Sequence, residues 1–137
     1  MKIVRGIIKP GKQIGDLEIG KSCKEHIDLL IHALEIEKRE GGSKKYTFEN
    51  FKLWFNADGE LDQIGVTNGF LDCYKNIGIG STMGDVKRLF GGYRCEYDDY
   101  LLPDIDGICF ALKDIDDSDE EWDELTAPIE WIFVYKI

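Results

Sequence analysis

The stretch from Asp116 to Leu125, DDSDEEWDEL, gathers more side chains that could do chemistry than its length would suggest. Seven of its ten residues are acids, and they surround one tryptophan, Trp122. Clustered carboxylates can bind a divalent cation, keep a loop solvated, or attract a basic protein. The surrounding sequence discriminates among these three chemistries.

A calcium-binding EF-hand loop requires glycine at its sixth position and glutamate at its twelfth. Counted from Asp114, these positions hold Asp119 and Leu125, and both flanks are typical of strands rather than helices. The spacing therefore predicts no dedicated metal site, and no cofactor is expected. Weak divalent binding by the clustered carboxylates stays open as an alternative.

Other catalytic patterns are poorly matched. His26 and His32 are six residues apart on an expected helix, so they point to different faces. No G-x-S-x-G motif occurs, and GIGSTMG (residues 78–84) lacks the Lys-Ser/Thr ending of a P-loop. The sequence favours a protein without catalytic activity. A small metal-dependent hydrolase using clustered carboxylates remains the alternative.

The net charge of −10 lies entirely in the second half of the chain. Residues 1–70 carry 11 Lys/Arg and 11 Asp/Glu, whereas residues 71–137 carry 6 Lys/Arg and 16 Asp/Glu. Nucleic acid requires a basic face, so we expect no nucleic-acid partner. A field of this sign steers a basic protein toward the chain.

Aromatic side chains are interleaved with thirteen acids and one base, Lys113, between Glu96 and Glu124. Tyrosine and tryptophan anchor protein interfaces, and surrounding charges select the partner. We therefore expect a docking surface for a basic protein, although a solvated loop with its tryptophan packed in the core is also compatible. The expected contact residues are Tyr97, Asp98, Asp99, Tyr100, Asp116, Asp117, Glu120, Glu121, Trp122 and Asp123.

Two capping boxes, sixty residues apart, mark the elements that must position these side chains. Ser22 and Glu25 form the first box and Thr82 and Asp85 the second, which predicts helices over residues 23–37 and 83–90. The first segment has an apolar stripe of helical period, and the second ends at two glycines. Strands are predicted at residues 46–50, 51–56, 61–67, 93–102, 106–114 and 129–137.

These elements predict an α+β fold of two tandem repeats, each with a capped helix and about three antiparallel strands. Repeat one spans about 13–70 and repeat two about 71–137, and we expect them to share one core in a single domain, 1–137, because about 60 residues are marginally stable alone. The apolar segment 129–137 is expected to be a buried central strand. The acidic stretch then lies in the hairpin connection before it.

The segments IGIGSTMGDVKRLFGG, LPDIDGICFAL and IEWIFV carry a resemblance to known proteins. Their pattern resembles the helix-plus-sheet repeat of the β-lactamase inhibitor protein and of the outer-membrane assembly lipoprotein family. The resemblance covers both halves and implies a sheet surface that binds another protein. In size and acidity, the chain is also similar in type to bacterial toxin-immunity proteins. That likeness implies a protein that neutralises a basic toxin domain, such as a nuclease, by occluding its active face; a structural accessory module is a further alternative.

The sequence also bears on the compartment. No stretch approaches the ~18–20 apolar residues of a membrane span, and no small-residue cleavage motif follows the first apolar runs. The four cysteines are scattered without a C-x-x-C pair, which is typical of reduced thiols. We therefore expect a cytoplasmic protein with no membrane partner; the sequence leaves its oligomeric state open.

Overall fold

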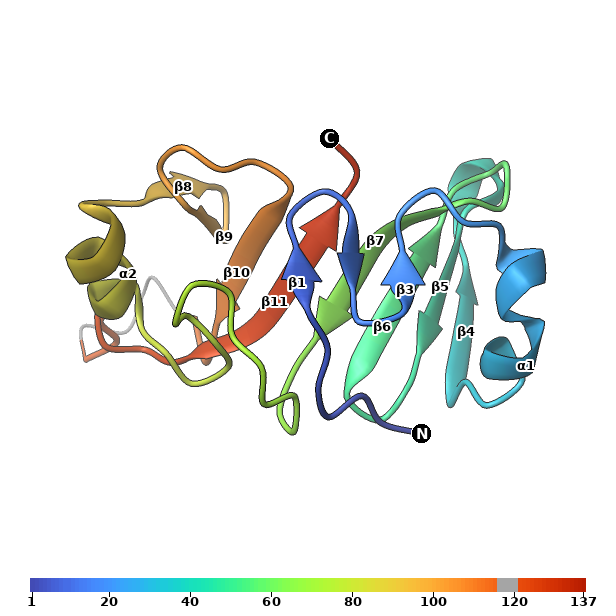
Figure 1. The fold of residues 1–137 in the computed structure, drawn as a ribbon, viewed down its shortest axis with the longest axis horizontal. Coiled ribbons are helices and arrows are strands. Elements are labelled where there is room, and N and C mark those ends of the chain that lie inside the picture. Colours follow the sequence, from blue (N-terminus) through green and yellow to red (C-terminus); the bar gives the residue numbers. More distant parts are fainter. Residues whose placement is uncertain (116–120) are drawn as a thin grey trace.

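The computed structural model describes residues 1–115 and 121–137, and antiparallel sheet dominates it (Figure 1). A large sheet has eight strands in the order β4-β5-β6-β7-β11-β10-β9-β8, and a small sheet has the order β1-β2-β3. The strands of the large sheet are β4 (Glu35–Lys38), β5 (Lys44–Thr47), β6 (Phe51–Phe55), β7 (Leu61–Val66), β8 (Arg94–Glu96), β9 (Asp99–Leu101), β10 (Ile108–Leu112) and β11 (Ile129–Tyr135). The expected mixture of helix and antiparallel sheet is confirmed at this level.

The remaining elements are short. The small sheet consists of β1 (Ile8–Lys9), β2 (Gln13–Ile14) and β3 (Leu17–Glu18). The helices are α1 (Ile27–Leu30) and α2 (Met83–Phe90), with 3₁₀ turns η1 (Cys23–His26) and η2 (Glu40–Gly42). Among the described residues, no helix is long and apolar enough to cross a membrane.

The small sheet lies against one face of the large sheet, between α1 and α2 toward its two ends (Figure 1). Its apolar residues Ile8, Ile14 and Leu17 join one core cluster with residues of both halves of the large sheet, such as Leu53 and Ile132. Strand β6 alternates between buried and half-buried residues, as a sheet with one covered face should. We call the other face of the large sheet the open face.

Strand β11 occupies the centre of the large sheet, as predicted. It pairs antiparallel with β7 on one side and β10 on the other, so it joins the two halves. Ile132 and Val134 are fully buried on the covered face. Trp131, Phe133 and Tyr135 are only half-buried on the open face, so the predicted buried central strand is fully buried on one face only.

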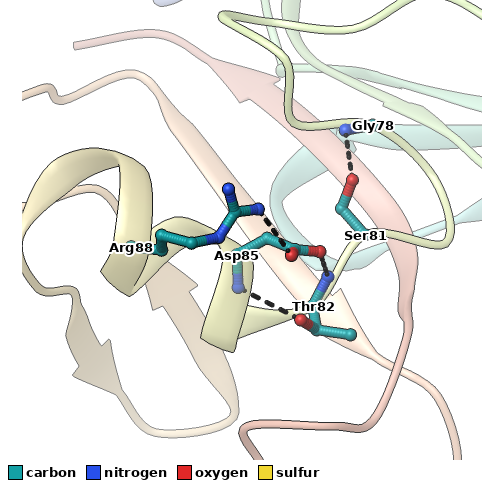
Figure 2. Close-up of polar contacts among 5 residues, drawn as sticks. All are labelled: Gly78, Ser81, Thr82, Asp85 and Arg88. Atoms are coloured by element: carbon teal, nitrogen blue, oxygen red, sulfur yellow. Dashed lines mark hydrogen bonds and ion pairs between the residues drawn. The ribbon is translucent and has the colours of Figure 1, made fainter.

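Both predicted capping boxes are present. At the start of α2, Asp85 N donates to Thr82 Oγ1 (3.1 Å) and Thr82 N donates to Asp85 Oδ2 (3.0 Å), as Figure 2 shows. Arg88 adds an ion pair to Asp85, and Gly91 ends the helix in the left-handed conformation (φ 82°). The predicted second helix is therefore confirmed at both ends.

The predicted extent of the first helix is wrong. Its capping box forms, but the helical segment ends at Leu30, and residues 35–38 form strand β4 against β5. Gly41 and Gly42 have φ values of 78° and 87°, which lets the chain turn back into this hairpin. Cross-strand pairing with β5 thus takes up residues that the prediction assigned to the end of the helix.

The predicted strand 93–102 is also wrong, because it is a hairpin of β8 and β9. Tyr97 sits at its turn with φ 56°, a conformation that side chains other than glycine rarely adopt. With β4 added in the first half and this hairpin in the second, the large sheet receives four strands from each half, one more than expected. The acidic stretch does lie in the connection between β10 and β11, and its residues 116–120 fall outside the described part of the chain.

Candidate functional site

The open face of the large sheet carries aromatic side chains that the core does not use. One cross-strand row runs from Glu37 through Lys45, Trp54 and Gln63 to Tyr135. Residues directly opposite one another in antiparallel strands project from the same face. This row therefore places a tryptophan and a tyrosine on the same surface, with charged residues at one end.

Phe133 is the centre of an aromatic cluster on this face. Its ring stacks on Trp131 (centroids 5.9 Å apart, planes at 10°) and meets Trp54 edge-on at 5.8 Å. Such pairs contribute ~0.5–1.5 kcal/mol beyond the area that they bury. The cluster is consequently a pre-ordered apolar platform in which the three rings hold one another.

Gly65 makes room for this platform. It lies opposite Phe133 in the pairing of β7 with β11. A Cβ atom at Gly65 would lie 2.8 Å from two atoms of the Phe133 ring, closer than real contacts allow. A glycine inside a strand often marks a close approach of this kind, so Gly65 is the signal in the sequence that points to this platform.

Basic side chains lie toward the β4 side of the open face. Lys52 Nζ lies 4.7 Å from the centroid of the Trp131 ring, within the range of a cation–π contact. Lys45 Nζ forms an ion pair with Glu37 (2.9 Å), and this contact lowers the pKa of the Glu37 carboxyl. The carboxylate of this pair is exposed, so the bond is worth little to stability.

A hollow of about 360 Å³ opens on the same face toward β8 and β9. Trp54, Phe133 and Tyr135 supply its aromatic lining, and Glu96 and Asp99 supply two carboxylates. Burial raises the pKa of Asp99, and the charges of Asp98 and Glu96 raise it further. The hollow therefore combines ring surfaces with unbalanced negative charge.

The first set of predicted contact residues divides between surface and core. Tyr97 is 99% exposed at the β8–β9 turn, Asp98 is exposed beside it, and Asp99 borders the hollow. Tyr100 is only 3% exposed, because it projects from β9 toward the covered face together with its cross-strand partner Phe110. Tyr97, Asp98 and Asp99 are accessible to a partner, whereas Tyr100 is a core residue.

The second predicted set is only partly described. Asp116, Asp117 and Glu120 lie outside the described residues. Glu121 and Asp123 are exposed. Trp122 is half-buried, packs against the core, and donates from Nε1 to the carbonyl oxygen of Lys113 (3.1 Å). The tryptophan therefore anchors the acidic segment to the fold, which agrees with the core-packed alternative raised by the sequence.

Glu124 is a structural residue that the prediction omitted. Its Oε1 accepts from Tyr93 Oη (2.7 Å) and its Oε2 accepts from Tyr100 Oη (3.1 Å). The hydrogen bond to Glu124 is the main reason that the pKa of Tyr93 rises to about 12. These bonds tie the acidic segment to β9 and so connect the two predicted contact sets. Glu124 is more than twenty residues from Tyr93 and Tyr100 in the sequence, so no local pattern predicts these hydrogen bonds.

Within residues 1–115 and 121–137, no group of three or more His, Cys, Asp or Glu side chains could hold a metal ion. The described geometry offers aromatic anchors, a hollow with carboxylates, and an exposed acidic hairpin. These features support binding of a surface that presents cationic side chains.

Comparison with known proteins supports the fold alone. No family model matches the chain, and no curated protein matches it. A solved structure of a cysteine-rich secretory protein from Staphylococcus aureus is similar, with a TM-score of 0.51 and 15% sequence identity. The similarity covers 93% of this chain but 47% of that protein, so the chain spans about half the length of its structural relative.

Proposed function

We propose that this chain is a protein-binding inhibitor that neutralises a basic toxin domain, such as a nuclease, as an immunity protein does. The observation that carries the proposal is the aromatic open face of the large sheet, bordered at β8 and β9 by exposed acids. Aromatic rings that are already ordered lose little conformational entropy on binding, so they suit an interface anchor.

The charge distribution supports a basic partner. All of the net −10 belongs to residues 71–137, which include the β8–β9 hairpin and the acidic segment. Complementary charges can raise association rates by about 10- to 1,000-fold at low salt. Fast capture matters for an inhibitor of this kind, since a toxin acts until it is bound.

The inhibition would be steric and electrostatic. Carboxylates of the hairpin would occupy the Lys- and Arg-rich surface that a nuclease uses for phosphates, and the aromatic platform would exclude water around it. No bond of the inhibitor is made or broken in this scheme. The proposal places the protein in the cytoplasm, where it would meet the toxin before the toxin acts.

We also infer that the two halves are tandem repeats. Each half begins with a capping box, continues through a helical segment, and adds four strands to the large sheet. The last strands of the halves, β7 and β11, are adjacent at its centre. The motif resemblance to the β-lactamase inhibitor protein supports this inference and the idea of a sheet surface that binds protein.

The test measures binding to the basic toxin domain encoded by a neighbouring reading frame. Reversing the charges of Asp98, Glu121 and Asp123 to lysine should slow association about tenfold or more at low salt and weaken its salt dependence. Trp54→Ala should act on dissociation instead, weakening affinity by about 2 kcal/mol. Stopped-flow kinetics at two ionic strengths separates these effects.

Glu40→Lys is the matched control, because Glu40 is an exposed acid on the turn between β4 and β5, away from the hairpin. It should change both rates less than about twofold. Association and dissociation that are unaffected in both the charge-reversal and tryptophan variants would refute the proposed surface.

A further inference from the structure

The hollow on the open face has the composition of a receptor for one cationic side chain. Its aromatic lining comes from β6 and β11 and its carboxylates from β8 and β9, so strands from both halves of the sheet build it. Its volume of about 360 Å³ is at the lower end for sites that hold small molecules. That size suits a single long side chain.

The carboxylates of the hollow belong to Glu96 and Asp99. Within the described part of the chain, neither Glu96 nor Asp99 forms an ion pair. The neighbouring Arg94 is engaged elsewhere: its guanidinium binds Asp106 (2.9 Å) and the carbonyl oxygen of Leu102 (2.9 Å). Glu96 and Asp99 lie opposite each other in the β8–β9 pairing, and no cation among residues 1–115 and 121–137 is paired with them.

Two further groups line the hollow, Cys109 and Tyr135. Burial, followed by the charges of Asp99 and Glu96, raises the pKa of the Cys109 thiol to about 12. The Cys109 side chain is only 8% exposed and lines the hollow. Tyr135 also has a raised pKa, mainly from burial.

The aromatic lining distinguishes the kind of cation. Trp54 and Phe133 meet edge-to-face, so ring faces and edges are both presented near the carboxylates. A guanidinium stacks on aromatic rings and also donates two parallel hydrogen bonds to a carboxylate. An ammonium is a compact, strongly hydrated charge that gains less from such a lining.

We propose that this hollow receives an arginine side chain of the inhibited partner. The guanidinium lies between the Trp54 and Phe133 rings and the carboxylates of Glu96 and Asp99. The inference rests on the proposed function for the identity of the partner, but the hollow can be tested without it. A partner would then need an arginine at one position of its interface, in addition to a basic surface.

The test titrates N-acetyl-arginine methylamide into the isotopically labelled full chain and follows amide chemical shifts by NMR. Saturable shifts are expected at Gln63, Cys109 and Phe133, which line the hollow. The neutral isostere N-acetyl-citrulline methylamide should bind at least about tenfold more weakly, the equivalent of one charge-assisted hydrogen bond. The lysine analogue should also bind more weakly than arginine.

Glu96→Gln/Asp99→Asn should reduce arginine binding to the level of citrulline. Glu40→Gln/Asp104→Asn removes the same net charge at exposed positions outside the hollow and should leave binding unchanged. Unchanged shifts elsewhere confirm that both variants are folded. Equal binding of arginine and citrulline, equal binding of arginine and lysine, or unaltered binding by the Glu96/Asp99 variant would overturn the inference.

The outcome also separates this inference from the proposed function. Arginine binding in the hollow without any binding of the toxin domain would remove the proposed function and keep the receptor. Toxin binding with no arginine response in the hollow would keep the proposed function and remove the arginine receptor.

Discussion

Glu124 shows how a single carboxylate can organise the acidic half of this protein. Both of its oxygens accept phenolic hydrogen bonds, and the rings of Tyr93 and Tyr100 that donate them lie 5.9 Å apart. Hydrogen bonds to a charged group contribute about 1.5–3 kcal/mol each. The acid that holds the segment in place is therefore distinct from the acids proposed to bind a partner.

Replacing Glu124 with glutamine should lower the free energy of unfolding at pH 7 by about 1–3 kcal/mol. The fold raises the pKa of Tyr93 from its ordinary value of 10 to about 12, so it favours the protonated phenol. This stabilisation is fully present below pH 10 and is lost as pH rises toward 12. Urea denaturation between pH 8 and 11 should therefore show a steeper decline for the native chain than for Glu124→Gln. Parallel declines would rule out the role assigned to Glu124, and Glu40→Gln serves as the neutral comparison.

At the scale of elements, local sequence patterns predict correctly only those helix ends that are set by contacts between nearby residues. The capping box and glycine stop fix α2 at both ends, because their hydrogen bonds join residues three or four positions apart. The apolar stripe of the first segment does not form a buried helix face, because Ile31 and Leu34 remain 72% and 69% exposed. The pairing of β4 with β5 makes residues 35–38 a strand instead of a helix. These contacts join residues about ten positions apart, so helical periodicity does not predict them.

Because the first helix is short, truncating its aliphatic residues should affect stability less than truncating those of α2. Ile31→Ala should lower the free energy of unfolding by no more than about 0.5 kcal/mol, because the side chain is already in water. Val86→Ala, on the covered face of α2 and fully buried, should lower it by about 1–3 kcal/mol. Thermal or urea denaturation of both variants checks this. A large loss at Ile31 would mean that the longer predicted helix packs after all.

At the scale of the whole molecule, β11 joins the two halves of the large sheet, and we expect them to unfold as one cooperative unit. Its Ile132 is fully buried and lies opposite Val66 of β7 and Phe110 of β10. Ile132→Ala should therefore destabilise the protein by about 2–5 kcal/mol and keep a single unfolding transition. Hydrogen exchange should increase together in β6 and β9, which lie on opposite sides of β11. Separate transitions for the two halves would contradict one shared core, and Ile137→Ala, 80% exposed, is the control.

The candidate site was predictable only in part for a related reason. Charge composition drew attention to Asp98 and Asp99, and both are exposed, as their polarity predicts. The aromatic platform was missed because a nearly continuous apolar strand suggests burial on both faces. Whether Phe133 faces solvent or a second layer depends on which face of the large sheet the small sheet and the helices cover. That choice depends on contacts between distant parts of the chain.

The division of tryptophans between the faces gives the protein a built-in optical reporter. Trp54 and Trp131 are half-buried on the open face, whereas Trp122 is held against the core by its bond to Lys113. A partner that covers the platform would dehydrate two indoles while leaving the third as an internal reference. Emission from the unmodified chain, compared with Trp122→Phe, would thus report occupancy of the open face in real time without any added label.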